Sequence, residues 1–259
     1  MIENRKLIAA IACRNKGSRL YGKPLQNLNE TKGIKIIDNI IDCLLEVKVI
    51  DNIVLGISEG NENIDFIDYS NSRSLPYILG SEEDVLERLI QCGEKQNATD
   101  IFRLTSESPF PTFSLIESSW KEHLETNSDA TFLDDIIDGC GFEIIKLEAL
   151  KKSHKLGEKK HRSELASLYI RENLDKFNVR KISCSKDLVR KDLRLTVDNP
   201  EDLIVCKAVY KEFEEDSPNI DIMKVISFLD KNNFLKELTH KYTEKGYESM
   251  YLWRNDEKK

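Results

Sequence analysis

The sequence predicts an α/β fold in which a mostly parallel mixed sheet is sandwiched by helices. Short apolar runs, typical of buried strands, recur along the first half of the chain, and amphipathic helical patterns separate them. Hydrophobic residues make up 40% of the chain and charged residues 33%, which is typical of a globular protein and not of a disordered one. The 259 residues suffice for one large domain, or for a domain with an appended lobe.

The first half of the chain alternates strand and helix. Residues 7–12 form a continuous apolar run, which predicts a buried strand, and residues 36–45 carry apolar side chains at helical spacing. The next helix is expected to begin at Ser81 as N-cap, with Asp84 as its capping-box partner. Further strands are expected at residues 53–57, 77–79, 101–104 and 130–133, and a helix at 115–124.

The alternation loosens in the second half. Strands are expected at residues 142–145, 179–184 and 193–197, and helices at 147–152, 163–172 and 220–235. Asn199 caps one more helix, and Pro200 occupies its first position, where proline is best tolerated. We expect residues 1–215 to form the α/β domain and residues 216–259 to form a helical extension packed on it.

Charge and cysteine usage disfavour several classes of protein. The net charge of −7 does not favour nucleic acid or an anionic membrane as partner. The six cysteines are scattered and form no CxxC pair, so we expect reduced thiols and no zinc site. No apolar run reaches the roughly 18 residues that span a membrane, and we find no signal peptide. A cytoplasmic location is therefore expected.

The first motif is a basic loop at residues 14–23, directly after the first predicted strand. It holds four cations and two glycines in ten residues of an otherwise acidic protein. In open α/β sheets ligands bind beyond the carboxyl ends of the strands, so this loop stands at the expected binding edge. A triphosphate requires close backbone N–H groups and several cations. A solvated basic loop is the alternative, since neither GxxxxGK[ST] nor GxGxxG is present.

Two acidic residues follow other predicted strands. Glu107 stands in a polar turn after the fourth strand, and Asp198 leaves the last one immediately before a capped helix. Carboxylates at strand ends can hold Mg²⁺ while phosphates supply further oxygen ligands. The alternative for Glu107 is an ordinary turn residue. Glu201 and Asp202 are best explained as acids that complement the N-terminus of the helix.

Five segments, in the right order, resemble the cytidylyltransferase family that includes SpsF, the CMP-Kdo synthetases and the acylneuraminate cytidylyltransferases. Residues 12–25 resemble its AR-x-x-S-x-RL-P-GK-x-L loop, and residues 80–88 its GSEDDVLER stretch. Residues 102–109 resemble VRITGDCP, residues 139–150 resemble G-x-D-x-E…FEAL, and residues 193–203 resemble LRLTVDTPEDL. The SpsF-like proteins are the nearest match. The resemblance implies the nucleotide-diphospho-sugar transferase type of fold.

The resemblance also implies residue roles. The catalytic residues, which would contact the triphosphate, would be Arg14, Arg19 and Lys23. Nucleotide contacts would come from Ala12, Arg14, Gly17, Ser18, Lys23, Gly80, Ser81 and Arg103. The metal ligands would be Glu107 and Asp198. The acceptor would be contacted by Glu143, His161 and Arg162.

The implied activity is Mg²⁺-dependent transfer of CMP from CTP to a sugar acid or sugar-like acceptor, with release of pyrophosphate, in surface glycan biosynthesis. A homodimer is expected because dimers are common in this family. The alternatives are a guanylyl- or uridylyltransferase of the same fold acting on a sugar phosphate, and an inactive nucleotide-binding homologue. The chain departs from the family pattern at Tyr21, Ser106, Glu107, Gly141 and Glu164, where the family has Pro, Gly, Asp, Asp and His.

Overall fold

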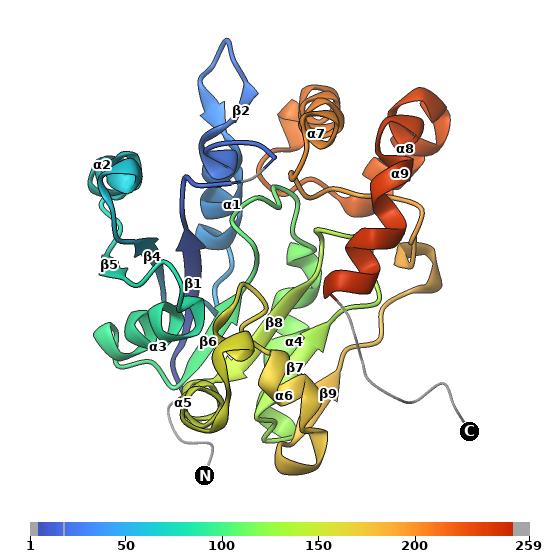
Figure 1. Cartoon of the computed structure of the whole chain (residues 1–259). Helices are drawn as coiled ribbons and strands as arrows, with labels where there is room; N and C mark the ends of the chain where they lie inside the picture. Colours follow the sequence, from blue (N-terminus) through green and yellow to red (C-terminus); the bar gives the residue numbers. More distant parts are fainter. Residues whose placement is uncertain (1–4, 18, 251–259) are drawn as a thin grey trace.

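The computed structural model describes residues 5–17 and 19–250, with side chains up to Thr243. A seven-stranded sheet in the order β5-β4-β1-β6-β8-β7-β9 forms its centre (Figure 1). Its strands are β1 (Leu7–Cys13), β4 (Asn52–Ser58), β5 (Tyr77–Gly80), β6 (Asp100–Arg103), β7 (Ala130–Leu133), β8 (Phe142–Lys146) and β9 (Val179–Lys181). β8 runs antiparallel to its neighbours β6 and β7, and the other pairs are parallel. The mostly parallel mixed sheet is confirmed.

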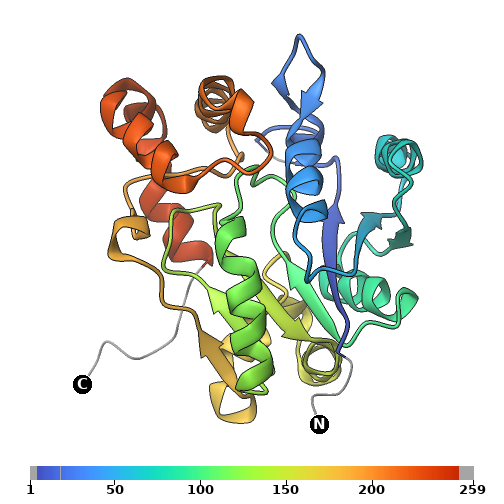
Figure 2. The same ribbon diagram turned by 180° about the vertical axis from the view of Figure 1, so that it is seen from behind.

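Helices cover both faces of this sheet. Helices α1 (Ile36–Leu45), α2 (Ile64–Ser72), α4 (Ile116–Glu125), α7 (Pro200–Glu212) and α8 (Ile222–Lys231) contribute to one core cluster. Helices α3 (Val85–Lys95), α5 (Leu147–Leu156) and α6 (Leu168–Glu172) contribute to the other. The two views from opposite sides show α3, α5 and α6 before the sheet in one and α1 and α4 before it in the other (Figures 1 and 2).

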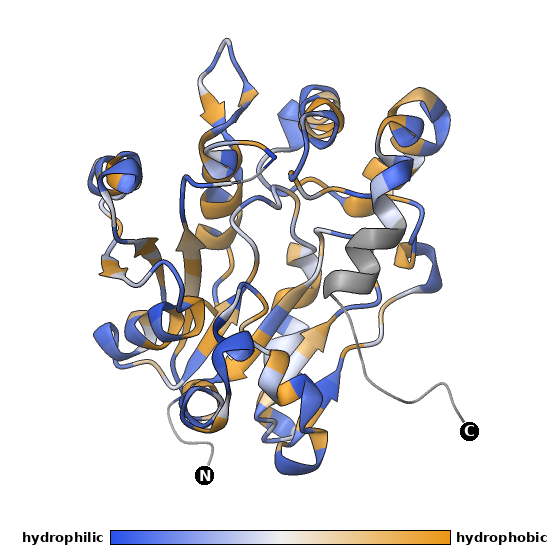
Figure 3. Cartoon of the chain, in the orientation of Figure 1, coloured by the Kyte–Doolittle hydropathy of each residue, from blue (hydrophilic) through white to orange (hydrophobic). Residues whose placement is uncertain are grey.

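The pleat of β1 explains why one strand supports two cores. Leu7, Ala9 and Ile11 belong to the first cluster, whereas Ile8 and Ala10 belong to the second. Successive side chains of a strand point to opposite faces, so a strand buried on both faces reads as a continuous apolar run. Figure 3 shows the same arrangement, with hydrophobic strands inside and hydrophilic outer faces on most helices.

The C-terminal segment packs on the rest of the chain. Ile222, Val225 and Leu229 of α8 are buried in the first core cluster. Helix α9 (Asn233–Met250) contacts both α7 and α8, although the sequence predicted a helix only to residue 235 followed by a polar tail. Within the part of the chain that is described, no helix is both long and apolar enough to cross a bilayer.

Three predicted elements differ from the observed ones. Residues 193–197 form no strand of the sheet and make a single bridge, between Asp138 and Arg194. Where one helix was expected at 163–172, residues 163–167 form an irregular turn and only the short α6 is helical; a 3₁₀ helix, Lys159–Arg162, precedes this turn. Asp84, and not Ser81, caps α3, because the Asp84 carboxylate accepts the Glu87 N–H at 2.9 Å.

Two elements were not predicted. Helix α2 has a short and weakly apolar sequence. The hairpin of β2 (Asn27–Asn29) and β3 (Ile34–Lys35) projects from the molecule beside α7 (Figure 1). Its strands are too short to give a recognisable alternation of apolar and polar residues.

Candidate functional site

A cleft opens beyond the carboxyl ends of β1 and β6, where the topology predicts a binding site. It measures about 970 Å³ with its open mouth included. The walls are the loop after β1, the turn after β6, the first turns of α3 and Glu164; among the lining residues are Ala12, Arg14, Gly17, Arg19, Lys23 and Arg103. Ser18 lies outside the described residues.

Local backbone geometry shapes the basic loop. Gly22 has a left-handed φ of 59°, and its N–H donates to the Asn15 carbonyl at 2.9 Å, which closes the loop. A Cβ at Gly17 would lie 2.4 Å from the Leu20 carbonyl oxygen, so the tight path requires glycine there. The loop therefore brings its backbone and cations to the mouth of the cleft.

Three cations, two from the basic loop and one from the segment before Asp198, pair with the Asp198 carboxylate. Lys23 Nζ lies 2.6 Å and an Arg19 nitrogen 3.0 Å from Asp198 Oδ1, and Arg194 pairs with Oδ2. Partial burial would raise the pKa of Asp198, but the hydrogen bond and charge of Lys23, with Arg194 and Arg19, outweigh it and hold the pKa below its ordinary value. Asp198 is therefore an ionised carboxylate at the edge of the cleft.

Glu107 lies on the neighbouring backbone segment. Its carbonyl accepts the Val197 N–H at 2.9 Å, which joins the turn after β6 to the residue that precedes Asp198. Burial raises the pKa of the Glu107 carboxyl; the charge of Lys23 opposes this, and the charges of Asp198 and Glu164 add to it. Glu107 thus lies near enough to Lys23 and Asp198 for their charges to act on its carboxyl group.

This carboxylate pair fits a divalent cation by its chemistry. Mg²⁺ is bound in proteins by one or two carboxylates together with substrate phosphates. Burial is the main cause that raises the Glu107 pKa, and the charge of Asp198 adds to it; a divalent cation held by the two acids would offset both effects.

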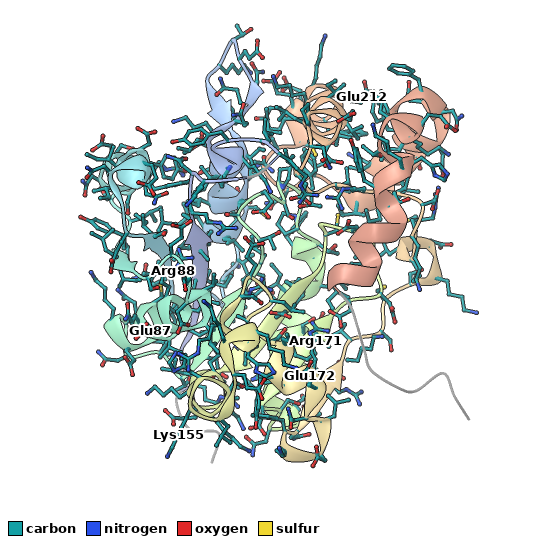
Figure 4. All side chains as sticks on the ribbon, viewed as in Figure 1. Glu87, Arg88, Lys155, Arg171, Glu172 and Glu212 are labelled. Carbon is teal, nitrogen blue, oxygen red and sulfur yellow. The ribbon has the colours of Figure 1, made fainter. Side chains whose placement is uncertain are left out.

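Arg88 belongs to the site but was not among the predicted site residues, although it lies in the motif at residues 80–88. It is fully buried on α3 (Figure 4), lines the cleft, and donates to the carbonyls of Cys13 at 3.1 Å and Gly56 at 2.9 Å. Arg88 therefore ties the ends of β1 and β4 together beneath the basic loop. The sequence signal for a buried role of Arg88 was its position on the otherwise apolar face of the predicted helix α3.

Gly80 and Ser81 do not line this cleft. A Cβ at Gly80 would lie 2.8 Å from Arg88 Cγ, so Gly80 makes room for the buried arginine. Ser81 lines a separate depression with Asp84 and Arg162, and its hydroxyl accepts the Glu83 N–H at 3.2 Å. The expected nucleotide contacts of Gly80 and Ser81 thus have no direct counterpart in the cleft.

A second, narrower cavity, of about 450 Å³ with its open mouth included, adjoins the first and shares Arg103, Leu104 and Thr105 with it. Glu143, an expected acceptor contact, lines this cavity together with Asp134, Asp138 and Arg171. Figure 4 labels Arg171, which α6 contributes.

The other two expected acceptor contacts lie elsewhere. His161 Nδ1 accepts the Glu158 N–H at 2.7 Å and Nε2 lies 2.9 Å from Glu172 Oε2, so both ring nitrogens have internal partners. Arg162 donates to Asp84 at 3.0 Å. Neither residue lines either cavity, because the segment that holds them turns as a 3₁₀ helix toward α3.

No family model matches the chain. The chain is 29% identical over 245 residues to the uncharacterized protein MJ1063 of Methanocaldococcus jannaschii, a match that covers 95% of this chain and 99% of the relative. It is 26% identical over 237 residues to the spore coat polysaccharide biosynthesis protein SpsF of Bacillus subtilis, covering 87% and 95% of the two chains.

Solved structures with the same fold include a cytidylyltransferase from Leptospira borgpetersenii, with a TM-score of 0.81 and 20% identity over 90% of this chain and 97% of the other. A CMP-Kdo synthetase complexed with CTP has a TM-score of 0.62 at 14% identity, covering 80% and 99%. Rv0371C of Mycobacterium tuberculosis, in complex with manganese, has a TM-score of 0.54 at 9% identity, covering 78% and 98%. The chain is thus related by sequence to SpsF, and its fold is of the nucleotide-diphospho-sugar transferase type; both findings support the resemblance to the SpsF-like cytidylyltransferase family that its motifs predict.

Proposed function

We propose that this protein is a Mg²⁺-dependent cytidylyltransferase that moves CMP from CTP to a sugar acid or sugar-like acceptor, with release of pyrophosphate, in surface glycan biosynthesis. The observation that carries the proposal is the meeting of Lys23, Arg19 and Asp198 beside Glu107 at the edge of one cleft. The relation to SpsF and the shared fold with a CTP-bound CMP-Kdo synthetase support it.

The triphosphate would lie against the basic loop. Arg14, Arg19 and Lys23 line the cleft, and Gly17 lets backbone N–H groups approach the phosphates. Ala12 and Arg103 would contribute further contacts, as would Ser18 by resemblance. Lys23 and Arg19 now neutralise Asp198, so we expect them to turn toward phosphate oxygens when nucleotide binds.

Asp198 and Glu107 would hold the divalent cation. When bound there, Mg²⁺ would orient the α-phosphate and withdraw charge from it. The manganese complex of the structural neighbour Rv0371C is consistent with a divalent ion in this fold.

The reaction would be an in-line displacement. An acceptor oxygen forms a bond to the α-phosphorus of CTP, and the bond from that phosphorus to the pyrophosphate oxygen breaks. Lys23 and Arg19 stabilise the negative charge that develops on the leaving pyrophosphate. The second cavity, on the other side of Arg103, would hold the acceptor.

The test is Mg²⁺-dependent pyrophosphate release with CTP and a panel of sugar acceptors. Lys23→Ala should lower kcat/KM by about 100-fold or more, because it removes charge stabilisation of the leaving group. Lys48→Ala, which changes an exposed lysine, should leave kcat/KM unchanged. Normal turnover by Lys23→Ala would refute the role of this lysine.

A panel of nucleoside triphosphates in thermal-shift measurements separates the alternatives. A shift with GTP or UTP in place of CTP would favour a guanylyl- or uridylyltransferase of the same fold. No shift with any triphosphate and Mg²⁺ would favour an inactive homologue. The proposal also includes a homodimer in the cytoplasm, and light scattering of the purified protein tests the dimer.

A further inference from the structure

The cavity next to the nucleotide cleft is lined by acids that outnumber its cations. Its charged lining residues are Arg103, Asp134, Asp138, Glu143 and Arg171, which gives three carboxylates and two guanidinium groups. Each of these five side chains is at least nine-tenths buried as a residue. The charges of this wall therefore act on a ligand with little screening by solvent.

Both arginines already have carboxylate partners. Arg171 pairs with Asp134 through two bonds, of 2.6 and 2.9 Å, and with Glu143 Oε1 at 2.8 Å. Arg103 donates to Glu143 Oε2 at 2.9 Å and to the carbonyl of Glu164. Glu143 thus lies between the two cations and occupies a face of each that could otherwise bind an anion.

Freeing either arginine for a ligand would be costly. If Arg171 turned to an incoming carboxylate, Asp134 and Glu143 would become buried anions with weaker compensation. The third acid, Asp138, is paired with Arg194, which lies behind the cavity wall and also binds Asp202 at 3.0 Å. Among the described residues that line the cavity, none offers an uncommitted positive charge.

The rest of the wall supplies hydroxyl groups. Ser108 Oγ donates to Thr196 Oγ1 at 3.0 Å and lies 2.5 Å from Thr105 Oγ1. Carboxylates and hydroxyls accept hydrogen bonds from sugar hydroxyls and amines, whereas a carboxylate of the ligand would meet carboxylates, hydroxyls and two guanidinium groups that are already paired with carboxylates. Gly141, where the family has an acid, also lines this wall and adds no cation to it.

We infer that the part of the acceptor bound in this cavity carries hydroxyl or amino groups and no carboxylate, so that the acceptor is a neutral or amino sugar-like polyol and not a sugar acid. This inference rests on the proposed function for the identity of the neighbouring cleft as a nucleotide site. It narrows the acceptor classes that the proposal leaves open.

The test measures binding without turnover. The full chain, saturated with Mg²⁺ and a CTP analogue whose α,β-bridging oxygen is replaced by methylene, is titrated with matched pairs of sugars by NMR. The pairs are glucose with glucuronate, galactose with galacturonate and mannose with mannuronate. We expect at least one neutral member to bind tenfold or more tightly than its acid. Equal or tighter binding of the acid, or binding of neither member of any pair, would overturn the inference.

Charge variants report on the cause of the preference. Glu143→Gln leaves Arg103 and Arg171 less compensated and should reduce the neutral-to-acid preference at least fivefold. Asp138→Asn should act in the same direction and serves if the first variant fails to fold. Glu148→Gln, on the exposed surface of α5, is the matched control and should leave the preference unchanged. An unchanged preference in both cavity variants would also overturn the inference.

Failure of the proposed function gives a different result. If the protein does not bind CTP, the nucleotide titration shows no saturation before any sugar is added, whereas the preference among sugars is read from separate resonances. A CTP-binding protein that prefers acids would leave the cytidylyltransferase proposal standing and remove only this inference.

Discussion

Lys23 and Asp198 are 175 residues apart in the chain, and their side chains meet at 2.6 Å. This contact joins the loop after β1 to the segment that leads into α7. The Asp198 carboxylate is therefore held ionised and is positioned by cations that come from the same loop as the expected phosphate contacts. Lys23 and Arg19 therefore neutralise Asp198, and a ligand must supply other charges to separate these pairs.

Removing the charge of Asp198 should abolish metal-dependent activity. Asp198→Asn keeps the shape of the side chain but removes one anionic metal ligand, so we expect kcat to fall about 100-fold or more and the Mg²⁺ requirement to rise. Titration of pyrophosphate release with Mg²⁺ measures both effects. Asp175→Asn, at an exposed position, is the control. Unaltered Mg²⁺ dependence in Asp198→Asn would exclude it as a ligand.

A methyl group at Gly17 should weaken nucleotide binding. The added Cβ would lie 2.4 Å from a backbone oxygen, so the loop must move. We expect Gly17→Ala to raise the Kd for CTP about tenfold, which corresponds to about 1.4 kcal/mol. Calorimetry with CTP and Mg²⁺ measures the change. Gly33→Ala, at a left-handed hairpin glycine with no atom within 4 Å of the new Cβ, should leave the Kd unaltered.

Arg88 should stabilise the fold as well as the site. Arg88→Met leaves the carbonyls of Cys13 and Gly56 without this donor, and we expect the free energy of unfolding to fall by about 2 to 4 kcal/mol. Urea unfolding measures the loss. Lys95→Met removes an exposed bond from the same helix to the Tyr77 carbonyl and should cost much less. Equal losses in the two variants would contradict the buried role of Arg88.

The buried pairs of the second cavity should make stability depend on pH. Burial acts to raise the pKa of Glu143, but Arg103 and Arg171 outweigh it and lower the pKa from 4.5 to about 2. A lowered folded-state pKa gives stability that is present above the ordinary pKa and is lost as the pH falls toward the folded one.

The Glu143→Gln variant isolates this effect. The difference in unfolding free energy between the wild type and Glu143→Gln should therefore shrink as the pH falls from about 5 to about 3. Urea titrations across this range give that difference. A difference that stays constant would show that Glu143 has an ordinary pKa.

Much of the fold could be predicted because its strands are buried on both faces and its helices are amphipathic. The run at residues 7–12 and the spacing at 36–45 predicted β1 and α1 to within a residue. The prediction of a strand at residues 193–197 was wrong, and the contacts of these residues show why. Leu193, Leu195 and Val197 are buried, as in a strand, but their backbone crosses the carboxyl end of the sheet and bonds to the Asp138 and Glu107 carbonyls instead of to a neighbouring strand.

The parts of the site that a single sequence segment contributes could be predicted. The charge of the loop at residues 14–23 is visible in the sequence, and so are acids at strand ends. The partners of Arg88 and Arg171 were not, because each arginine bonds to residues more than 25 positions away that only the tertiary fold brings near. The prediction of Ser81 as the cap was wrong because local sequence does not rank two capping residues that lie three positions apart.

The reversed direction of β8 brings different connections of the chain to the two cavities. Because β8 runs antiparallel, Glu143 stands near its start, opposite Arg103 at the end of β6. The connection from β7 to β8 therefore arrives at the second cavity, whereas the connections that form the nucleotide cleft leave from β1 and β6. Substitutions in residues 134–141 therefore act directly on the second cavity, and through the Asp138–Arg194 pair they also reach Asp198, which Arg194 contacts as well.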